Sequence, residues 1–258
     1  MQPRALVLLA NGTNRDQEAA AALELAGARA EIVPLNQLRM REKTWADYQV
    51  LVLPGGFSYA DALGAGKLLA LDLEAYFADE VHAFVEGGKP VIGICNGFQA
   101  LVKAGLIPNS DGGRPTATLT FNASGRFECR WVTLVPQSRT CVWTRDLTGL
   151  IYCPVAHGEG RFALADPTEA TELMRNDQVA FVYSRRDGSP ASGSFPENPN
   201  GSLKDIAGVC NPEGNVLGLM PHPEDHIYRY QHPRWTRGES GETGLGIFEN
   251  GVRYAAQL

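Results

Sequence analysis

Short apolar runs alternate with helical stretches over residues 4–104 of the chain. Strands that are buried on both faces of a parallel sheet read as continuous apolar runs, and parallel neighbours need a crossover connection, usually a helix. Runs of this kind occur at residues 4–9, 28–33, 49–53 and 91–94. Because such crossovers are right-handed in nearly all proteins, the pattern predicts a doubly wound α/β sheet.

Helices are predicted between these strands, at residues 14–26, 78–86 and 96–104. Asn14, with Gln17 three residues later, resembles a capping box at the start of the first helix. Gly27 suits the left-handed position just past the end of that helix.

From residue 116 onward the apolar residues recur with a period of two, which is typical of antiparallel strands. Strands are predicted at residues 116–122, 126–135 and 140–143, and a last helix at residues 245–256. These strands predict an antiparallel extension of a mostly parallel sheet. The candidate catalytic residues lie in both halves, so we expect one α/β domain over residues 1–258.

The composition excludes several classes of function. A net charge of −6 over 258 residues argues against nucleic-acid binding, which needs a basic surface. The apolar run at residues 5–10 is too short for a signal-peptide core or a membrane span. We therefore expect a cytoplasmic protein that acts on a small molecule or a protein partner, with no membrane.

The chain contains five cysteines and no C-x-x-C pair, which matches neither a disulfide framework nor a zinc motif. Cys129, Cys141, Cys153 and Cys210 are interpreted as small buried hydrophobic residues.

Cys95 differs, because it stands at the corner where an apolar strand turns into a helix, flanked by Gly93 and Gly97. This is the arrangement of a nucleophile elbow, with cysteine in place of serine. A position before a helix N-terminus also favours the thiolate. Cys95 is therefore the predicted nucleophile.

A cysteine nucleophile needs a proton shuttle, and His222 follows an apolar strand with Glu224 two residues later. The carboxylate could hold the imidazole in orientation, as in a catalytic triad. The oxyanion would be bound by the backbone amide of Asn96, next to the nucleophile, and by that of Gly56 in a tight glycine turn.

Two other motifs are incomplete. Residues 64–67 resemble part of a phosphate-binding loop, but Asp61 replaces the first glycine and Leu68 the Ser or Thr. His222 and Glu224 fit the H-x-E half of a zinc deaminase motif, yet no P-C-x-x-C follows. We therefore predict no metal and no cofactor on this chain.

The combination of Cys95, His222 and Glu224 resembles the catalytic triad of class I glutamine amidotransferases. Six segments narrow the resemblance to the glutaminase subunits of phosphoribosylformylglycinamidine synthases, and they span nearly the whole chain in order. They lie at residues 12–14, 54–61, 93–99, 122–128, 157–161 and 220–224. Arg15 and Ala60 depart from the family pattern, and residues 227–244 form a longer stretch than the family leads us to expect.

The resemblance implies a flavodoxin-like glutamine amidotransferase fold and a glutaminase that supplies ammonia. It implies a large synthetase partner that uses ATP and Mg²⁺, and often a small third subunit, in the fourth step of purine synthesis. It also implies that Gln99, Phe57 and His157 contact the glutamine substrate.

Two alternatives stay open from the sequence. One is a stand-alone cysteine hydrolase, such as a γ-glutamyl hydrolase or a relative of the Cys-His elbow proteases and deglycases. Those elbow enzymes tend to place histidine directly after cysteine, where this chain has Asn96. The other is a regulatory module that has lost catalysis.

Long loops are predicted at residues 185–204 and 223–244, and loops of this length are often ordered by a partner. In the second loop, Arg229, Arg234 and Arg237 are the candidates for partner contact.

Overall fold

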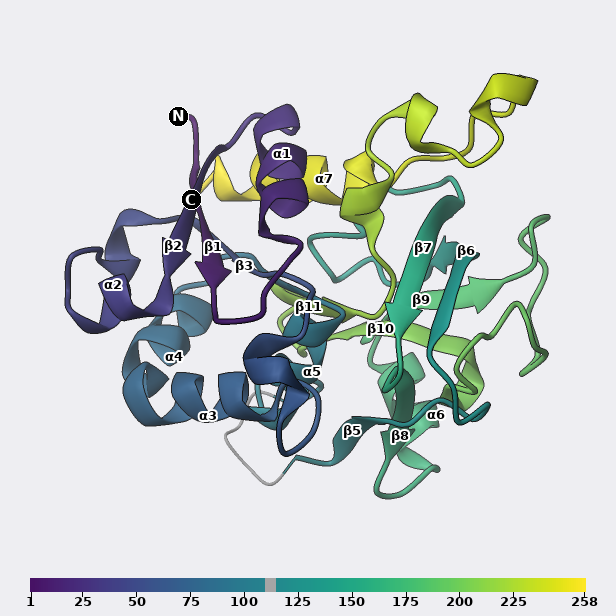
Figure 1. Cartoon of the computed structure of the whole chain (residues 1–258), viewed down its shortest axis with the longest axis horizontal. Coiled ribbons are helices and arrows are strands. Elements are labelled where there is room, and N and C mark those ends of the chain that lie inside the picture. The colour runs from purple at the N-terminus through teal and green to yellow at the C-terminus, as the bar shows by residue number, and fades with distance from the viewer. Residues whose placement is uncertain (110–114) are drawn as a thin grey trace.

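A nine-stranded mixed β-sheet forms the centre of the molecule in the computed structural model, which describes residues 1–109 and 115–258 (Figure 1). In spatial order its strands are β2 (Arg29–Pro34), β1 (Arg4–Leu9), β3 (Val50–Leu53), β4 (Val91–Ile94), β11 (Val216–Leu219), β10 (Ile206–Cys210), β9 (Val179–Ser184), β6 (Glu128–Pro136) and β7 (Ile151–His157). Neighbours are parallel from β2 to β11 and antiparallel from β11 to β7. The predicted mostly parallel sheet with an antiparallel extension is confirmed.

Helices cover both faces of the parallel part of the sheet. α1 (Asp16–Leu25) and α7 (Leu245–Ala255) contact each other on one face, and α3 (Lys67–Tyr76), α4 (Ala78–Glu86) and α5 (Asn96–Lys103) gather on the other (Figure 1). The remaining described α-helices are α2 (Leu35–Arg39) and α6 (Glu169–Arg175). A separate antiparallel pair joins β5 (Ala117–Thr120) and β8 (Arg161–Leu164). No helix in the described ranges is long and apolar enough to cross a membrane.

The pairing of β4 with β11 brings the two halves of the chain to one place. The strands run parallel in register, with Val91 beside Val216 and Ile94 beside Leu219. Their carboxyl ends therefore lie side by side at one edge of the sheet. The residues that follow, Cys95 after β4 and His222 after β11, meet there.

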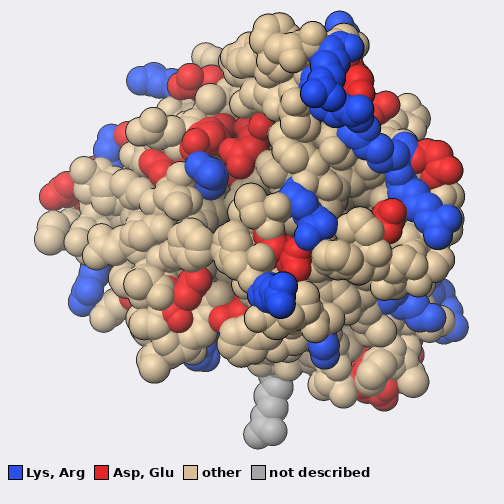
Figure 2. All heavy atoms as spheres, turned by 45° about the vertical axis from the view of Figure 1, so that its right-hand side comes forward, with Lys and Arg blue, Asp and Glu red and all other residues tan. Residues whose placement is uncertain are grey.

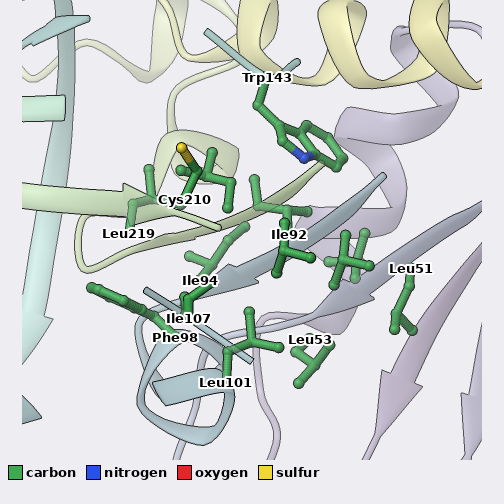
Figure 3. Packing of buried hydrophobic residues seen from close by; sticks show 14 of the residues in the cluster. Leu51, Leu53, Ile92, Ile94, Phe98, Leu101, Ile107, Trp143, Cys210 and Leu219 are labelled. Atoms are coloured by element: carbon green, nitrogen blue, oxygen red, sulfur yellow. The ribbon is translucent and has the colours of Figure 1, made fainter. Parts of the chain in front are cut away.

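The core around this strand pair is closely packed (Figure 3). Ile92 and Ile94 of β4 and Leu53 of β3 are fully buried, and Phe98 of α5 stacks on Phe162 with 6.3 Å between ring centroids. Glycines allow the close packing: a Cβ added to Gly97 would lie 1.9 Å from the carbonyl oxygen of Leu53. The helix that carries the elbow is thus held directly against the sheet.

Residues 140–143 form turns rather than the predicted strand. The Asp177 carboxylate accepts hydrogen bonds from the backbone N–H groups of Arg139 and Thr140, at 2.9 and 2.8 Å. The Ser138 hydroxyl oxygen accepts a third from the N–H of Cys141 at 3.0 Å. Side-chain oxygens thus bind backbone N–H groups that, in a strand, would donate to a neighbouring strand.

The predicted capping box is also wrong. α1 begins at Asp16, and its N-cap residue Arg15 makes no side-chain capping bond. The N–H of Asn14 instead donates to the carbonyl oxygen of Gly55 at 3.3 Å, because this segment packs on the turn after β3. The left-handed conformation predicted for Gly27 is confirmed by its φ of 99°.

Other outcomes concern the cysteines and the long loops. Cys141, Cys153 and Cys210 are buried as predicted, but Cys129 on β6 is exposed. Residues 185–204 and 223–244 contain no α-helix and no sheet strand, as predicted. They contain short 3₁₀ turns: η3 (Leu203–Asp205), η4 (Pro223–Asp225), η5 (Arg229–Gln231) and η6 (Trp235–Arg237).

Replacing Gly97 by alanine tests how tightly the elbow helix is packed. The added methyl group would force α5 away from Leu53, and overpacking of this kind typically costs about 1–3 kcal/mol of unfolding free energy. Gly149→Ala is the control, since its nearest neighbour would be the Glu242 side chain at 3.9 Å. Urea denaturation should show a clear loss for Gly97→Ala alone, and equal stability of both variants would contradict the packing described.

Candidate active site

Cys95 occupies a strained corner between β4 and α5. Its backbone has φ 50° and ψ −102°, a conformation that L-residues rarely adopt. The N–H of Cys95 donates to the carbonyl oxygen of Leu219 at 2.8 Å, which ties the corner to the end of β11. The side chain is buried, and its sulfur lies 3.8 Å from the carbonyl oxygen of Ala156. The predicted elbow geometry is therefore present.

His222 and Glu224 form a buried pair just beyond β11. Nδ1 of His222 lies 2.7 Å from Oε1 of Glu224, and the Glu224 side chain is 0% exposed. The N–H of His222 donates to the carbonyl oxygen of Pro154 on β7 at 2.8 Å, which fixes the backbone. Because the carboxylate accepts the Nδ1 proton, Nε2 is the nitrogen left to serve Cys95.

Opposing effects act on the pKa of His222. Burial lowers it, but the charges of Glu224 and Cys95 and the hydrogen bonds to both side chains outweigh burial. The pKa of His222 is therefore raised well above that of an ordinary histidine. A protonated imidazole beside the sulfur stabilises the thiolate, which is the nucleophilic form of cysteine.

In the glycine turn after β3, the backbone N–H groups of Gly55 and Gly56 have no backbone acceptor among the described residues. The N–H of Phe57 is taken by the carbonyl oxygen of Gly12 at 2.9 Å, whereas no backbone hydrogen bond of the Gly56 amide occurs among the described residues. Gly56 has φ 144°, and an added Cβ would lie 2.7 Å from the backbone nitrogen of Asn14. Gly56 therefore needs to be glycine, and its amide is available.

Asn96 contributes in two ways. Its backbone N–H lies at the first position of α5, where no intrahelical acceptor exists. Its side chain binds the segment after the glycine turn: Oδ1 accepts from the N–H of Ser58 at 3.1 Å, and Nδ2 donates to Asp61 at 2.9 Å. Asn96 thus links the elbow to the turn that carries Gly56.

Cys95 opens onto a cavity of about 160 Å³. The lining residues include predicted site residues and several that were not predicted: Gly56, Phe57, Asp61, Ala65, Gln99, Phe121, Phe127, Ala156, His157, Gly158 and Glu159. The structure therefore brings Gly56, Phe57, Gln99 and His157 together with Cys95. The predicted site residues Asn96, His222 and Glu224 are not among those that line this cavity.

Gln99 and His157 are both held by neighbours. The Gln99 side chain donates from Nε2 to the carbonyl oxygen of Glu159 at 2.5 Å, and its Oε1 accepts from Asn96 at 3.1 Å. Nδ1 of His157 lies 3.1 Å from Oδ1 of Asn122, which also accepts from the N–H of Gly160. Oδ1 can only accept, so His157 carries its proton on Nδ1.

His157 is neutral, because burial, followed by the charge of His222, lowers its pKa to about 3. Its Nε2 has no hydrogen-bond partner among the described residues. Sequence reasoning assigned no role to Asn122 or Glu159, although both stand in motifs that carry the family resemblance. A buried asparagine that sets a histidine tautomer gives no separate signal in a single sequence.

No group of three or more His, Cys, Asp or Glu side chains in the described ranges could hold a metal ion.

An elbow cysteine, a buried histidine–glutamate pair and a glycine turn on this sheet define a glutamine amidotransferase. The model of the CobB/CobQ-like glutamine amidotransferase domain matches residues 2–255, and the chain belongs to this family. More particularly, it is 55% identical to phosphoribosylformylglycinamidine synthase subunit PurQ of Treponema denticola, over 98% of this chain and 99% of that protein. The subunit PurQ of Methanococcus maripaludis is 39% identical, over 98% and 97%.

Solved structures agree. A chain of PurLQS from Thermotoga maritima matches with a TM-score of 0.76 and 33% identity, over 98% of this chain and 99% of that chain. The glutaminase domain of Trypanosoma brucei CTPS matches with a TM-score of 0.55 and 12% identity, which shows the fold alone. The predicted resemblance to the glutaminase subunits of phosphoribosylformylglycinamidine synthases is confirmed.

Covalent labelling tests the assignment of Cys95. A glutamine analogue with a diazo-ketone electrophile should add one label, at Cys95, because only this thiol lies in the cavity beside His222. The exposed Cys129 is the built-in control, since a general alkylating reagent should reach it first. Peptide mass spectrometry that finds the analogue spread over other cysteines, with glutaminase activity intact, would contradict the assignment.

Substitutions of the buried pair should differ in severity. His222→Ala removes the proton shuttle, and general acid–base catalysis typically contributes about a hundred- to ten-thousand-fold in rate. Glu224→Gln keeps the size of the side chain and a hydrogen-bond acceptor, so its loss in kcat should be smaller. Steady-state rates of glutamine hydrolysis test this order, with folding checked by thermal melting. Wild-type rates for both variants would contradict the roles assigned to His222 and Glu224.

Proposed function

We propose that this chain is the glutaminase subunit of a phosphoribosylformylglycinamidine synthase, which hydrolyses glutamine to glutamate and ammonia. The observation that carries the proposal is the strained, buried Cys95 in the wall of a small cavity, with the buried pair of His222 and Glu224 beside it. The two PurQ relatives, each matched over nearly its full length, support the same activity.

The reaction follows from the positions of these groups. The Cys95 sulfur attacks the carboxamide carbon of glutamine, and the amides of Gly56 and Asn96 bind the oxyanion that forms. His222 gives its proton to the nitrogen as the carbon–nitrogen bond breaks, which releases ammonia and leaves a glutamyl thioester. Water, deprotonated by His222, then attacks the thioester carbon; the carbon–sulfur bond breaks, and glutamate leaves.

Within the cavity, we propose that Phe57, Gln99 and His157 contact the substrate. Unprotonated Nε2 of His157 can accept a hydrogen bond from a donor on glutamine. Gln99 uses one N–H of its amide nitrogen to bind the Glu159 carbonyl, and the second N–H of that nitrogen can donate to the substrate.

The ammonia passes to a partner: a large synthetase subunit that uses ATP and Mg²⁺ to convert formylglycinamide ribonucleotide into formylglycinamidine ribonucleotide. A small third subunit completes the complex. The relatives named as synthase subunits and the PurLQS structure support this division. We propose that the chain itself binds no nucleotide and no metal, and that residues 1–258 act as one domain in the cytoplasm.

Two surfaces suit the partner. Exposed phenylalanines line the mouth of the cavity, with Phe57, Phe121 and Phe127 exposed by 45%, 69% and 52%. An apolar cover there would keep water away from the released ammonia. Basic side chains also gather in a band along one edge of the molecule (Figure 2).

The loop after His222 contains the three arginines that the sequence predicts to contact the partner. Arg229, Arg234 and Arg237 are all exposed, on or beside the turns η5 and η6, which project from the body of the molecule (Figure 1). Arg234 pairs with Glu239 at 3.1 Å, so part of its charge is already neutralised. We propose Arg229 and Arg237 as the stronger contacts with the partner.

The division of labour predicts a selective loss. Cys95→Ala should abolish synthesis that depends on glutamine, whereas synthesis from added ammonium salt should continue, because the synthetase site is intact. Cys129→Ala is the matched control and should leave both activities unchanged. A folded, complex-forming Cys95→Ala protein that loses both activities would contradict the proposal.

Coupling to the partner is the second prediction of this proposal. We expect slow glutamine hydrolysis by the chain alone and faster hydrolysis once the synthetase, its nucleotide and its ribonucleotide substrate are bound, since partner binding can order catalytic loops. Hydrolysis rates measured with each addition test this. A rate that is high alone and indifferent to every addition favours a stand-alone hydrolase.

A further inference from the structure

An ion pair joins two active-site segments that are far apart in the sequence. Nε of Arg15, the residue before α1, lies 3.4 Å from Oδ2 of Asp225, the last residue of η4. The side chains are 38% and 21% exposed, and α1 packs against η4. Asp225 directly follows Glu224, yet neither member of the ion pair takes part in the reaction steps above.

The backbone of the same segment holds the glycine turn. The N–H groups of Asn14 and Arg15 both donate to the carbonyl oxygen of Gly55, at 3.3 and 3.2 Å. A Cβ built on Gly55 would lie 2.6 Å from Cε1 of His222 and 3.5 Å from Cγ of Arg15. Gly55 therefore lies close to both the Arg15 side chain and the His222 ring, one residue before the amide of Gly56.

We propose that Arg15 and Asp225 are positioning residues for glutamine hydrolysis, whose ion pair sets the placement of the Gly56 amide relative to His222. Arg15 holds the glycine turn through its backbone and the turn of Glu224 through its side chain. Loss of either charge would let the oxyanion donor and the proton shuttle move apart. The inference rests on the proposed function.

The groups around Asp225 have opposing effects on its pKa. Burial and the neighbouring charge of Glu224 raise the pKa of Asp225 to about 6, and Glu18 on α1 acts in the same direction. His222 and Arg15 oppose this rise. Asp225 is therefore ionised at neutral pH and protonates as the pH falls through about 6, at which point the ion pair is lost. Arg15 also forms an ion pair with Glu18, in which Nη1 of Arg15 lies 3.3 Å from Oε1 of Glu18.

Arg15→Gln, Asp225→Asn and the double variant test the proposal in the assembled complex. Each single change should lower kcat for glutamine hydrolysis by about tenfold, since misplacement by an ångström can cost up to a hundredfold. KM should change by less than about twofold, because substrate binding is not the target. The double variant should be no slower than the slower single variant, as expected for two partners of one interaction.

The pH profile separates positioning from simple structural support. In the wild type, kcat should fall as the pH drops through about 6. Asp225→Asn should lack this step, because the side chain is already neutral. Arg15→Gln should lack it as well, because no ion pair is left for the protonation of Asp225 to break. Identical profiles in all proteins, or additive losses in the double variant, would overturn the proposal.

Arg4→Gln is the matched control. Arg4 pairs with Glu31 at 3.1 Å, and its side chain is 38% exposed, as is that of Arg15, but it lies on β1 away from the cavity. This variant should keep the wild-type kcat, and a loss equal to that of Arg15→Gln would overturn the assignment.

Synthesis from ammonium salt should be unchanged in every variant, which shows that the complex is intact. If the wild-type complex does not hydrolyse glutamine, the proposed function fails and this inference with it. If the wild type hydrolyses glutamine and the Arg15 and Asp225 variants match its rate and profile, this inference alone fails.

Discussion

The close contact of α5 with β3 and β4 is the constraint on which the rest of the structure depends. Side chains at Gly93 and Gly97 would collide with α5 and with the Leu53 carbonyl, so only glycine lets the chain turn from strand to helix in so little space. The turn places Cys95 at φ 50°, a strained conformation that the surrounding packing must hold. Because β11 pairs with β4 in parallel, the same packing delivers His222 to the same edge of the sheet.

Burial and the neighbouring charged groups together determine the electrostatics at that edge. His222 is charged in spite of burial, because Glu224 lies 2.7 Å away and the Cys95 sulfur is close, whereas neighbouring His157 is neutral. Two neighbouring histidines thus have opposite protonation states: burial and the charge of His222 lower the pKa of His157, whereas Glu224 and Cys95 outweigh burial at His222. The proposed proton shuttle, His222, is thus charged, and the proposed substrate contact, His157, is neutral.

Sequence reasoning located Cys95, His222 and the glycine turn because strand ends, glycines and prolines mark such positions locally. The helices α2, α3 and α6 were not predicted, although the apolar spacing of Leu69, Ala70 and Leu73 in α3 is that of a helix face. The strand predicted at residues 140–143 failed for another reason: Asp177, distant in sequence, binds its backbone donors. The hydrogen bond between Asn122 and His157 and the ion pair of Arg15 with Asp225 are also long-range, and no single-sequence pattern encodes them.

Trapping the covalent intermediate tests the central claim most directly. The complex would be mixed with glutamine, quenched in acid within one turnover and digested for mass spectrometry. The account predicts a glutamyl thioester on the peptide that contains Cys95, formed in wild type and absent in Cys95→Ala. Glutamine turnover with no adduct at Cys95, or with an adduct on another residue, would contradict the account.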